Sequence, residues 1–233
     1  MIKKIKLNNV TLIGIDCVDI ERLRKAMDIT EEHIEFAEVK LLSSIKTDDK
    51  RWVEIEAITS IESFSEFCIK DLSEYVETDY ALLVQYDGFV LNPQSWTDEF
   101  LKYDYIGAPW YIEEEFWFEK FDIPRELTGQ HIVGNGGFSL RSKKFLETSA
   151  RLAKDGKFSK YHPEDLVMCV YDKHLFDGAG IKFAPYEIAR KFSIEGTDET
   201  YSDQFGFHGF KWTDISKWTS ENPQYGIKNQ FVG

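Results

Sequence analysis

Short apolar runs alternate with an amphipathic stretch at the start of the chain. Residues 10–16 (VTLIGID) and 33–42 (HIEFAEVKLL) are rich in aliphatic and β-branched side chains, and each predicts a strand. Residues 19–29, between them, have the mixed pattern of a helix. The chain therefore begins as strand, helix, strand.

The next part of the chain repeats that order. Thr59 and Glu62 have the spacing of a capping box, which predicts a helix over residues 60–76. The run ALLVQ at 81–85 then predicts a buried strand. Strands joined by helices in this way indicate a parallel, Rossmann-like sheet.

The second half of the chain is less regular but carries clear boundary signals. Residues 131–142 (HIVGNGGFSLRS) predict a glycine-rich turn that leads into a strand, and Ser142 is a good cap for a helix over 143–153. Pro163 suits the first position of a further helix over 163–175. We expect a single α/β domain over residues 1–233, with a mixed, mainly parallel central sheet flanked by helices.

Composition narrows the class of protein further. Hydrophobic residues make up 42% of the 233 residues, which is enough for a packed core. No run approaches the roughly 20 apolar residues of a membrane span, and no signal-peptide pattern is visible. The three cysteines, Cys17, Cys68 and Cys169, lie far apart without a CxxC pair. We therefore expect a cytoplasmic protein without a transmembrane segment.

The charge balance excludes one class of partner. Lysine and arginine number 28 against 41 acidic residues, a net charge of −13. Nucleic-acid binding requires a basic surface, so we expect no nucleic-acid partner. A phosphate-bearing ligand on so acidic a chain would need a local cation, and a divalent metal supplies one compactly.

Carboxylates stand where ligands bind in parallel sheets. Asp16 and Asp87 follow the first and the third predicted strands, and ligands bind at the carboxyl ends of such strands. Asp87, in QYDGF, is a candidate metal ligand, with an ordinary Asp-Gly turn as the alternative. Thr11 and Asp16, placed at the end of the first strand, are candidate contacts for a nucleotide.

A glycine-rich turn and an aromatic segment suggest contacts with a sugar. GNGGFSLR contains Asn135, Gly136 and Gly137, and its glycines permit close backbone approach while the amide can bind hydroxyl groups. It is not the GxGxxG pattern of a dinucleotide cradle. Trp110, which opens the aromatic and acidic segment 110–121, can stack on a sugar ring or pack into the core.

Two further motifs carry titratable groups. Glu164 and Asp165 follow Pro163, where the helix macrodipole favours ionised carboxylates. They either complement that dipole or include a general base. His208, in FGFHGFK, stands between glycines that permit close approach, and Lys211 is a candidate partner for a phosphate.

The order of these motifs resembles a known family. QYDGF, YIGAPW, VGNGGFSLRS, PEDLVMC and FGFHGF look like a family of uncharacterised GT-A-like glycosyltransferase domains of microbes and viruses. The resemblance covers roughly residues 9–212, and VGNGGFSLRS followed by PED is its most specific part. More distantly, the layout is similar to that of β-1,4- and β-1,3-galactosyltransferases.

The resemblance implies a function and roles for named residues. It implies an inverting transfer of a sugar from a nucleotide diphosphate donor, a UDP-sugar by default, to a glycan acceptor, with Mn²⁺ or Mg²⁺. Asp87 and His208 would bind the metal, Asp165 would be the base and Glu164 would contact the acceptor. The chain departs from the usual Asp-x-Asp motif, because Gln85 stands in the first position.

The predicted contacts divide the chain between the two substrates. Residues 1–92 would bind the nucleotide sugar, 93–212 would bind the acceptor, and 213–233 would form a C-terminal tail. Donor contacts would come from Thr11, Asp16, Asp87 and Lys211, and acceptor contacts from Trp110, Asn135, Gly136 and Gly137. A retaining transferase, a carbohydrate-binding module and a nucleotidyltransferase remain as alternatives.

Overall fold

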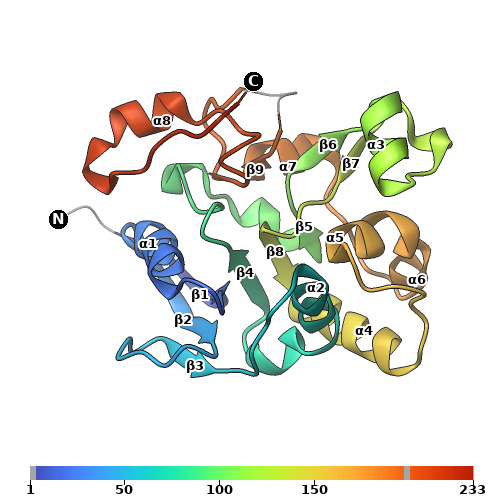
Figure 1. Ribbon diagram of the computed structural model, residues 1–233, viewed down its shortest axis with the longest axis horizontal. Helices are drawn as coiled ribbons and strands as arrows, with labels where there is room; N and C mark the ends of the chain where they lie inside the picture. Colours follow the sequence, from blue (N-terminus) through green and yellow to red (C-terminus); the bar gives the residue numbers. More distant parts are fainter. Residues whose placement is uncertain (1–3, 197–199, 233) are drawn as a thin grey trace.

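A mixed sheet forms the centre of the molecule. The computed structural model describes residues 4–196 and 200–232. Within this part, six strands form the sheet in the order β3-β2-β1-β4-β8-β5 (Figure 1). They are β1 (Ile5–Ile15), β2 (Ile34–Ser43), β3 (Trp52–Glu54), β4 (Tyr80–Val84), β5 (Tyr105–Ile106) and β8 (Phe138–Ser142). β1 to β4 are mutually parallel and β8 is antiparallel to both of its neighbours, which confirms the predicted mixed, mainly parallel sheet.

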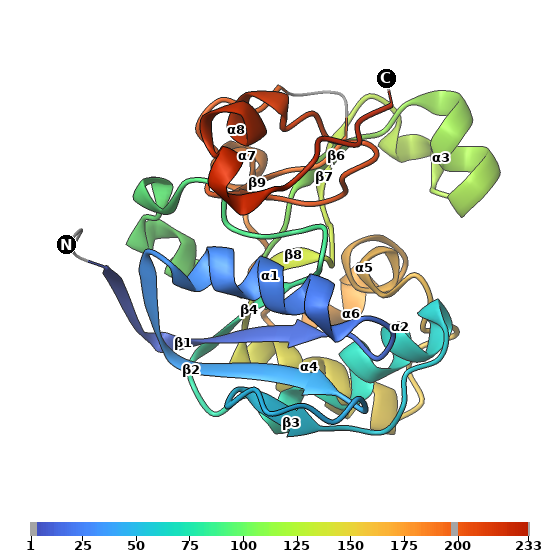
Figure 2. The same ribbon diagram turned by 60° about the vertical axis from the view of Figure 1, so that its left-hand side comes forward.

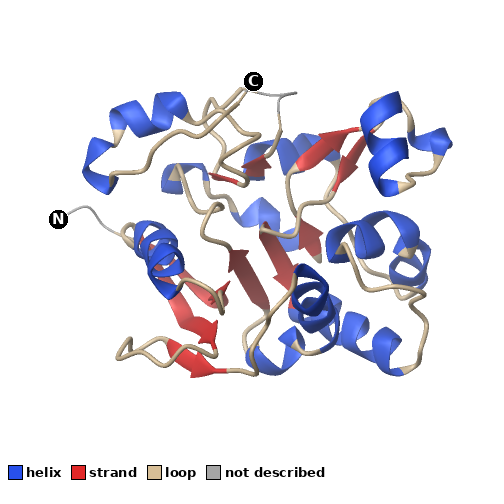
Figure 3. Cartoon of the chain, in the orientation of Figure 1, coloured by secondary structure: helices blue, strands red, loops and turns tan. Residues whose placement is uncertain are grey.

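Helices and two small sheets surround the central sheet (Figure 3). The α-helices are α1 (Ile20–Glu31), α2 (Ile61–Lys70), α3 (Glu114–Phe121), α4 (Lys143–Lys154), α5 (Glu164–Leu166), α6 (Lys173–Gly178), α7 (Tyr186–Phe192) and α8 (Ser216–Glu221). The 3₁₀-helices are Leu72–Tyr75, Pro93–Ser95, Asp98–Lys102, Arg125–Leu127 and Pro223–Tyr225, and Val167–Tyr171 is a π-helix. The small sheets pair β6 (Pro109–Tyr111) with β7 (His131–Val133), and β9 (Ser193–Ile194) with β10 (Gly206–Phe207).

Both faces of the central sheet are covered, which explains its apolar strands. Along β1, Leu12 packs in one cluster with side chains of α1 and α7, and Ile13 packs in another with side chains of α2 and α4. Strands buried on both faces become continuous hydrophobic runs rather than alternating ones. Gly14 lets α1 lie close, because an added Cβ would stand 2.7 Å from Met27 Sδ.

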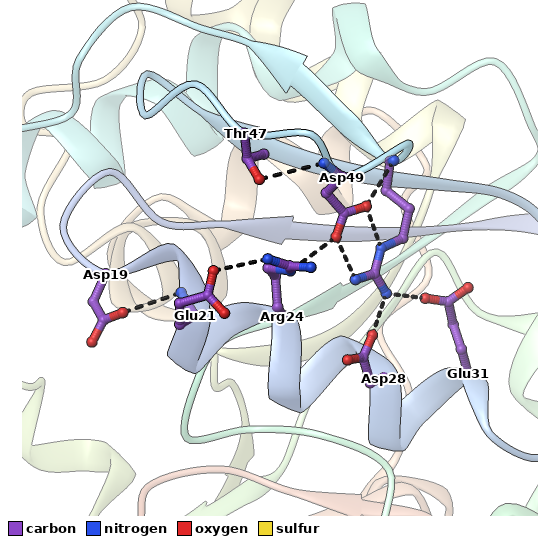
Figure 4. A network of polar contacts seen from close by, with 8 residues as sticks. Asp19, Glu21, Arg24, Asp28, Glu31, Thr47 and Asp49 are labelled. Atoms are coloured by element: carbon purple, nitrogen blue, oxygen red, sulfur yellow. Dashed lines mark hydrogen bonds and ion pairs between the residues drawn. The ribbon is translucent and has the colours of Figure 1, made fainter.

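The first helix begins as the sequence predicts, and a network of ion pairs fastens it. Asp19 caps α1, accepting hydrogen bonds from two backbone N–H groups of its first turn. The guanidinium of Arg51 lies 2.7 Å from Asp28 of α1 and 2.7 Å from Asp49. Arg24 of α1 lies 3.2 Å from the same Asp49 (Figure 4). These contacts hold α1 against the loop before β3.

The helix predicted over residues 60–76 begins as expected but ends early. Its capping box is formed by Ser60 and Ser63 rather than by Thr59 and Glu62: the Ser60 hydroxyl accepts from Ser63 N at 3.1 Å, and Ser63 Oγ accepts from Ser60 N at 3.0 Å. A serine at the third helical position can thus complete the box locally. α2 ends at Lys70, and a 3₁₀ turn follows.

The helix predicted over residues 143–153 forms as α4. Ser142 caps it as expected, accepting from Phe145 N at 3.0 Å.

The helix predicted over residues 163–175 is divided. Pro163, however, has a ψ of 134°, so its backbone is extended and it precedes the helix instead of occupying its first position. Asp172 N donates to Val167 O, five residues back, which makes the middle of the segment π-helical.

Two expectations drawn from composition concern cysteines and membranes. Cys17, Cys68 and Cys169 are free thiols. Across residues 4–196 and 200–232, helices are too short or too polar to cross a bilayer.

Candidate active site

The strand order places a topological switch point between the loops that follow β1 and β4. From β1 the chain moves outward through β2 to β3, whereas β4 lies on the other side of β1. The two loops therefore diverge at this point, which is where open α/β sheets bind ligands. Asp16 directly follows β1, and the turn Gln85–Gly88 directly follows β4. Figure 2 shows β1 and β4 side by side beneath α1.

Asp16 is at this switch point, but its carboxylate is already bound by groups of the protein itself. It is 7% exposed, and its Oδ1 accepts from Val18 N at 2.7 Å and from Asp19 N at 3.0 Å. Its Oδ2 accepts from Arg22 Nε at 2.6 Å. Asp16 thereby shapes the loop after β1 and fixes the side chain of Arg22.

Thr11 lies inside the sheet, not at the strand end where the sequence analysis places it. β1 continues to Ile15, so Thr11 is four residues from its end, about 13 Å at strand spacing. It pairs with Ala81 of β4 and is fully buried, and its hydroxyl lies 2.7 Å from the Thr78 hydroxyl.

The QYDG segment is a tight two-residue turn. Gln85 N donates to Gly88 O at 3.2 Å and Gly88 N donates to Gln85 O at 3.1 Å, so Tyr86 and Asp87 occupy its tip. Within the described residues, the buried Oδ1 of Asp87 has no hydrogen-bond partner. This atom stands 3.6 Å from His208 Nε2. A buried carboxylate oxygen without a donor is typical of an atom that a ligand or metal completes.

A second carboxylate holds His208 in place. Glu195 Oε1 lies 2.6 Å from His208 Nδ1, and the Asn135 amide nitrogen lies 3.0 Å from the same ring atom. Gln85 Oε1 lies 3.1 Å from Nε2. Burial lowers the pKa of His208, but the neighbouring carboxylates of Glu195, Asp87 and Asp165 outweigh it and raise that pKa to about 9. The ring is thus oriented with Nε2 toward Asp87.

Sequence reasoning missed Glu195. The residue directly follows the short strand β9 and precedes Gly196, so a carboxylate stands between a strand and a glycine here as it does at Asp87. Trp110, a predicted acceptor contact, is 8% exposed, and its indole N–H donates to Glu195 Oε2. Trp110 therefore supports the carboxylate that orients His208.

These residues fit a divalent metal on two conditions: ligands must also come from outside the protein, and His208, protonated at neutral pH with a pKa of about 9, must release the Nε2 proton as the metal binds. Carboxylate and imidazole are good ligands for Mn²⁺, and a carboxylate behind the second ring nitrogen is the usual support of a metal-binding histidine. Across the described residues, no cluster of three or more His, Cys, Asp or Glu side chains forms a metal site. The remaining ligands would have to be phosphate oxygens and water.

The glycines of the GNGG turn make room for side chains of the protein itself. An added Cβ would stand 2.1 Å from Trp110 at Gly134, 2.2 Å from Glu164 Oε1 at Gly136, and 2.1 Å from His208 Nε2 at Gly137. Asn135, at a φ of 61°, is 1% exposed, and its Oδ1 accepts from Phe138 N at 2.9 Å. The turn is thus the point at which the site's side chains converge.

Asp165 and Glu164 lie beside this turn in different surroundings. Asp165 is half-buried; it accepts from Gly136 N at 3.1 Å and from Leu166 N at 2.8 Å. Burial, with the charges of Glu164 and Glu195, raises its pKa to about 7. This outcome is opposite to the expected effect of the macrodipole, because α5 has only three residues and burial dominates.

Glu164 is 6% exposed and bound from two sides. It accepts from Ser65 Oγ at 3.1 Å, and Arg141 Nη2 lies 3.8 Å from it. Arg141, fully buried, also donates to Gly136 O at 3.3 Å.

Lys211, a predicted phosphate contact, is exposed and stands three residues after His208.

Comparison by sequence identifies a family. The family model described as "Protein of unknown function (DUF5672)" matches residues 49–208. This range includes the QYDG turn, the GNGG turn, the Glu164–Asp165 pair and His208. No curated protein matches the chain by sequence.

Comparison by structure identifies the fold. The galactosyltransferase LgtC, solved with donor and acceptor sugar analogs, is 14% identical, with a TM-score of 0.50 over 96% of this chain and 97% of that one. A mannosyltransferase from Pyrobaculum calidifontis, solved with GDP-Man and Mn²⁺, is 11% identical, with a TM-score of 0.42 over 77% and 55% of the two chains. The bifunctional IspDF from Campylobacter jejuni is 13% identical, with a TM-score of 0.47, and this chain covers 48% of its length. The likeness to LgtC, over nearly the full length of both chains, shows a glycosyltransferase-like fold.

Proposed function

We propose that this chain, which belongs to the DUF5672 family, is a glycosyltransferase that moves a sugar from a nucleotide diphosphate donor to a carbohydrate acceptor. The observation that carries the proposal is the pairing of Asp87 and His208 at the switch point between β1 and β4. The buried Oδ1 of Asp87 lacks a hydrogen-bond donor within the described residues and lies 3.6 Å from His208 Nε2. The expected donor is a UDP-sugar and the expected compartment is the cytoplasm.

Asp87 and His208 would hold a divalent metal, Mn²⁺ or Mg²⁺, together with the donor diphosphate. When bound, the metal would neutralise charge on the departing diphosphate. Glu195 keeps His208 Nε2 directed at this position, and Lys211 is proposed to meet the phosphates from the same loop. Asp16 supports the donor side through the loop after β1, whereas Thr11, which is fully buried inside the sheet, is not proposed as a donor contact.

Asp165 is the proposed general base. A pKa of about 7 suits this role, because a base is most effective when its pKa lies near the working pH. The acceptor hydroxyl would lose its proton to Asp165 as its oxygen attacks the sugar carbon and the bond from that carbon to the diphosphate breaks. The acceptor is proposed to contact Glu164, Trp110 and the turn from Asn135 to Gly137. Residues 1–92 are proposed to bind mainly the donor and residues 93–212 mainly the acceptor, with His208 and Lys211 of the second part reaching the donor diphosphate.

A screen of nucleotide sugars tests the proposal. Each donor is incubated with the protein and Mn²⁺, and both binding and release of the nucleoside diphosphate are measured. We expect one donor to be turned over, and we expect Asp87→Ala or His208→Ala to remove most turnover while the thermal unfolding midpoint stays near that of the wild type. Full activity in excess EDTA would show that no metal is needed.

The same screen separates the alternatives. A carbohydrate-binding module would bind glycans but would not bind nucleotide sugars in a manganese-dependent way. A nucleotidyltransferase would release pyrophosphate instead of a nucleoside diphosphate. The anomeric configuration of the product distinguishes inversion from retention, and an active Asp165→Asn enzyme would favour retention.

A further inference from the structure

An arginine and a partly exposed tyrosine stack on each other at the switch point between β1 and β4. Tyr86, at the tip of the QYDG turn, is 39% exposed, which is unusual for a large aromatic side chain in this chain. The guanidinium carbon of Arg22, from the first turn of α1, lies 3.9 Å from the centre of its ring. The pair thus joins the loop after β4 to the helix after β1.

The arginine in this pair is fixed before any ligand arrives. Arg22 Nε donates to Asp16 Oδ2 at 2.6 Å, and the other oxygen of Asp16 accepts from the backbone of the same loop. A guanidinium that lies over a ring and is anchored by a carboxylate holds the ring in one orientation. Tyr86 is therefore a rigid, flat surface with one side backed by Arg22.

The turn places this ring next to the proposed metal position but separate from it. Tyr86 and Asp87 are adjacent at the tip of the turn, yet Tyr86 contacts Arg22 on the α1 side, whereas Asp87 faces His208 on the side of the C-terminal loop. A ligand with its diphosphate at Asp87 that extends toward the end of β1 would pass over Tyr86.

We propose that Tyr86, supported by Arg22 and Asp16, is the stacking surface for the base of the nucleotide donor. This inference rests on the proposed function and adds the residues that recognise the nucleoside part of the substrate. Stacking of a base on an aromatic side chain contributes about 1–3 kcal/mol and tolerates different bases. Tyr86 therefore contributes affinity for nucleoside diphosphates in general, and the choice among bases comes from other contacts.

The test compares a nucleoside diphosphate with inorganic pyrophosphate, because only the former carries a base. Binding of UDP, ADP, GDP, CDP and pyrophosphate, each with Mn²⁺, is measured by calorimetry for the wild type, Tyr86→Leu and Tyr86→Phe. We expect Tyr86→Leu to weaken binding of the preferred nucleotide by about 5- to 150-fold and to leave pyrophosphate affinity within about twofold. Tyr86→Phe keeps the ring and should bind like the wild type.

Tyr186→Leu is the matched control. Tyr186 is also partly exposed and also lies beneath an arginine, Arg190, whose guanidinium is 5.4 Å from its ring centre, but it belongs to α7. Its replacement should leave nucleotide affinity unchanged. Arg22→Gln, which removes the support behind the Tyr86 ring, should produce a smaller loss than Tyr86→Leu.

The outcomes separate this inference from the function on which it rests. If the wild type binds none of the nucleotides, the proposed function fails and the stacking role fails with it. If the wild type binds a nucleotide and Tyr86→Leu binds it equally well, only the stacking role is overturned. Equal losses for nucleotide and pyrophosphate would also overturn it, since a structural disturbance would then explain both.

Discussion

Replacing Asp165 by asparagine tests the proposed chemistry most directly. With a pKa of about 7, Asp165 is about one-tenth ionised at pH 6, about half ionised at pH 7 and about nine-tenths ionised at pH 8. If the carboxylate is the base, wild-type kcat should rise about fivefold from pH 6 to pH 7 and less than twofold from pH 7 to pH 8. Asp165→Asn should lower kcat by about 10²–10⁴ and remove this pH dependence.

The same substitution has a consequence for stability that needs no substrate. The pKa of Asp165 in the folded protein, about 7, is above its ordinary value of 3.8, so folding favours the protonated form. Between these two values the unfolded chain has lost the proton and the folded protein has kept it. The free energy of unfolding therefore falls as pH rises through this window. Above about pH 7 the folded protein carries the buried charge, and the free energy of unfolding stays at its lower value.

The size of this effect follows from the two pKa values. Their difference corresponds to at most about 4 kcal/mol, and because Asp165 is only half-buried we expect about 2 kcal/mol. Asp165→Asn should thus gain about 2 kcal/mol relative to the wild type when the pH is raised from 4 to 8. Urea unfolding followed by tryptophan fluorescence at both pH values measures it.

The exposed Asp155 at the end of α4 provides the control, since Asp155→Asn should show no such change with pH. A stability difference between wild type and Asp165→Asn that stays constant from pH 4 to pH 8 would refute the raised pKa. Unchanged kcat in Asp165→Asn would refute the role as base. Glu164→Gln should mainly raise the acceptor KM, and the reverse pattern would exchange the two roles.

Two further predictions concern His208. Gly137→Ala should abolish manganese-dependent nucleotide binding, because its Cβ would stand 2.1 Å from His208 Nε2. Gly178→Ala, with no atom within 4 Å of the added Cβ, should bind like the wild type. Equal binding by both variants would contradict the close packing at Gly137. Glu195→Gln should weaken manganese affinity in the presence of nucleotide by about 10- to 100-fold, because His208 loses the carboxylate that orients it. Calorimetric titration with Mn²⁺ measures both effects, and wild-type affinity in Glu195→Gln would remove its positioning role.

The sequence by itself determined the class of fold. Strand and helix periods are local properties, so the order strand, helix, strand and the Ser142 cap could be predicted without knowing the partners of any element. Boundaries were less certain where local choices compete. The sequence predicted the capping box at Thr59 and Glu62, whereas in the structure Ser60 and Ser63 form it.

The sequence also indicated several site residues but not their surroundings. Asp87 was conspicuous because it follows an apolar strand, and His208 because glycines flank it. Only folding brings Asp87 and His208 together. Gln85, two residues before Asp87, contacts His208 although the two are 123 residues apart in the sequence. Glu195 escaped notice because its importance lies in its contact with a distant ring.

Tertiary structure alone decided the electrostatics of the site. The macrodipole, a local property, predicts ionised carboxylates after Pro163, but burial beside the GNGG turn and the nearby charges of Glu164 and Glu195 raise the pKa of Asp165. The stacking of Arg22 on Tyr86 likewise requires β4 to lie beside β1. Periodicity is encoded along the chain, whereas desolvation and charge contacts depend on which distant residues the fold brings together.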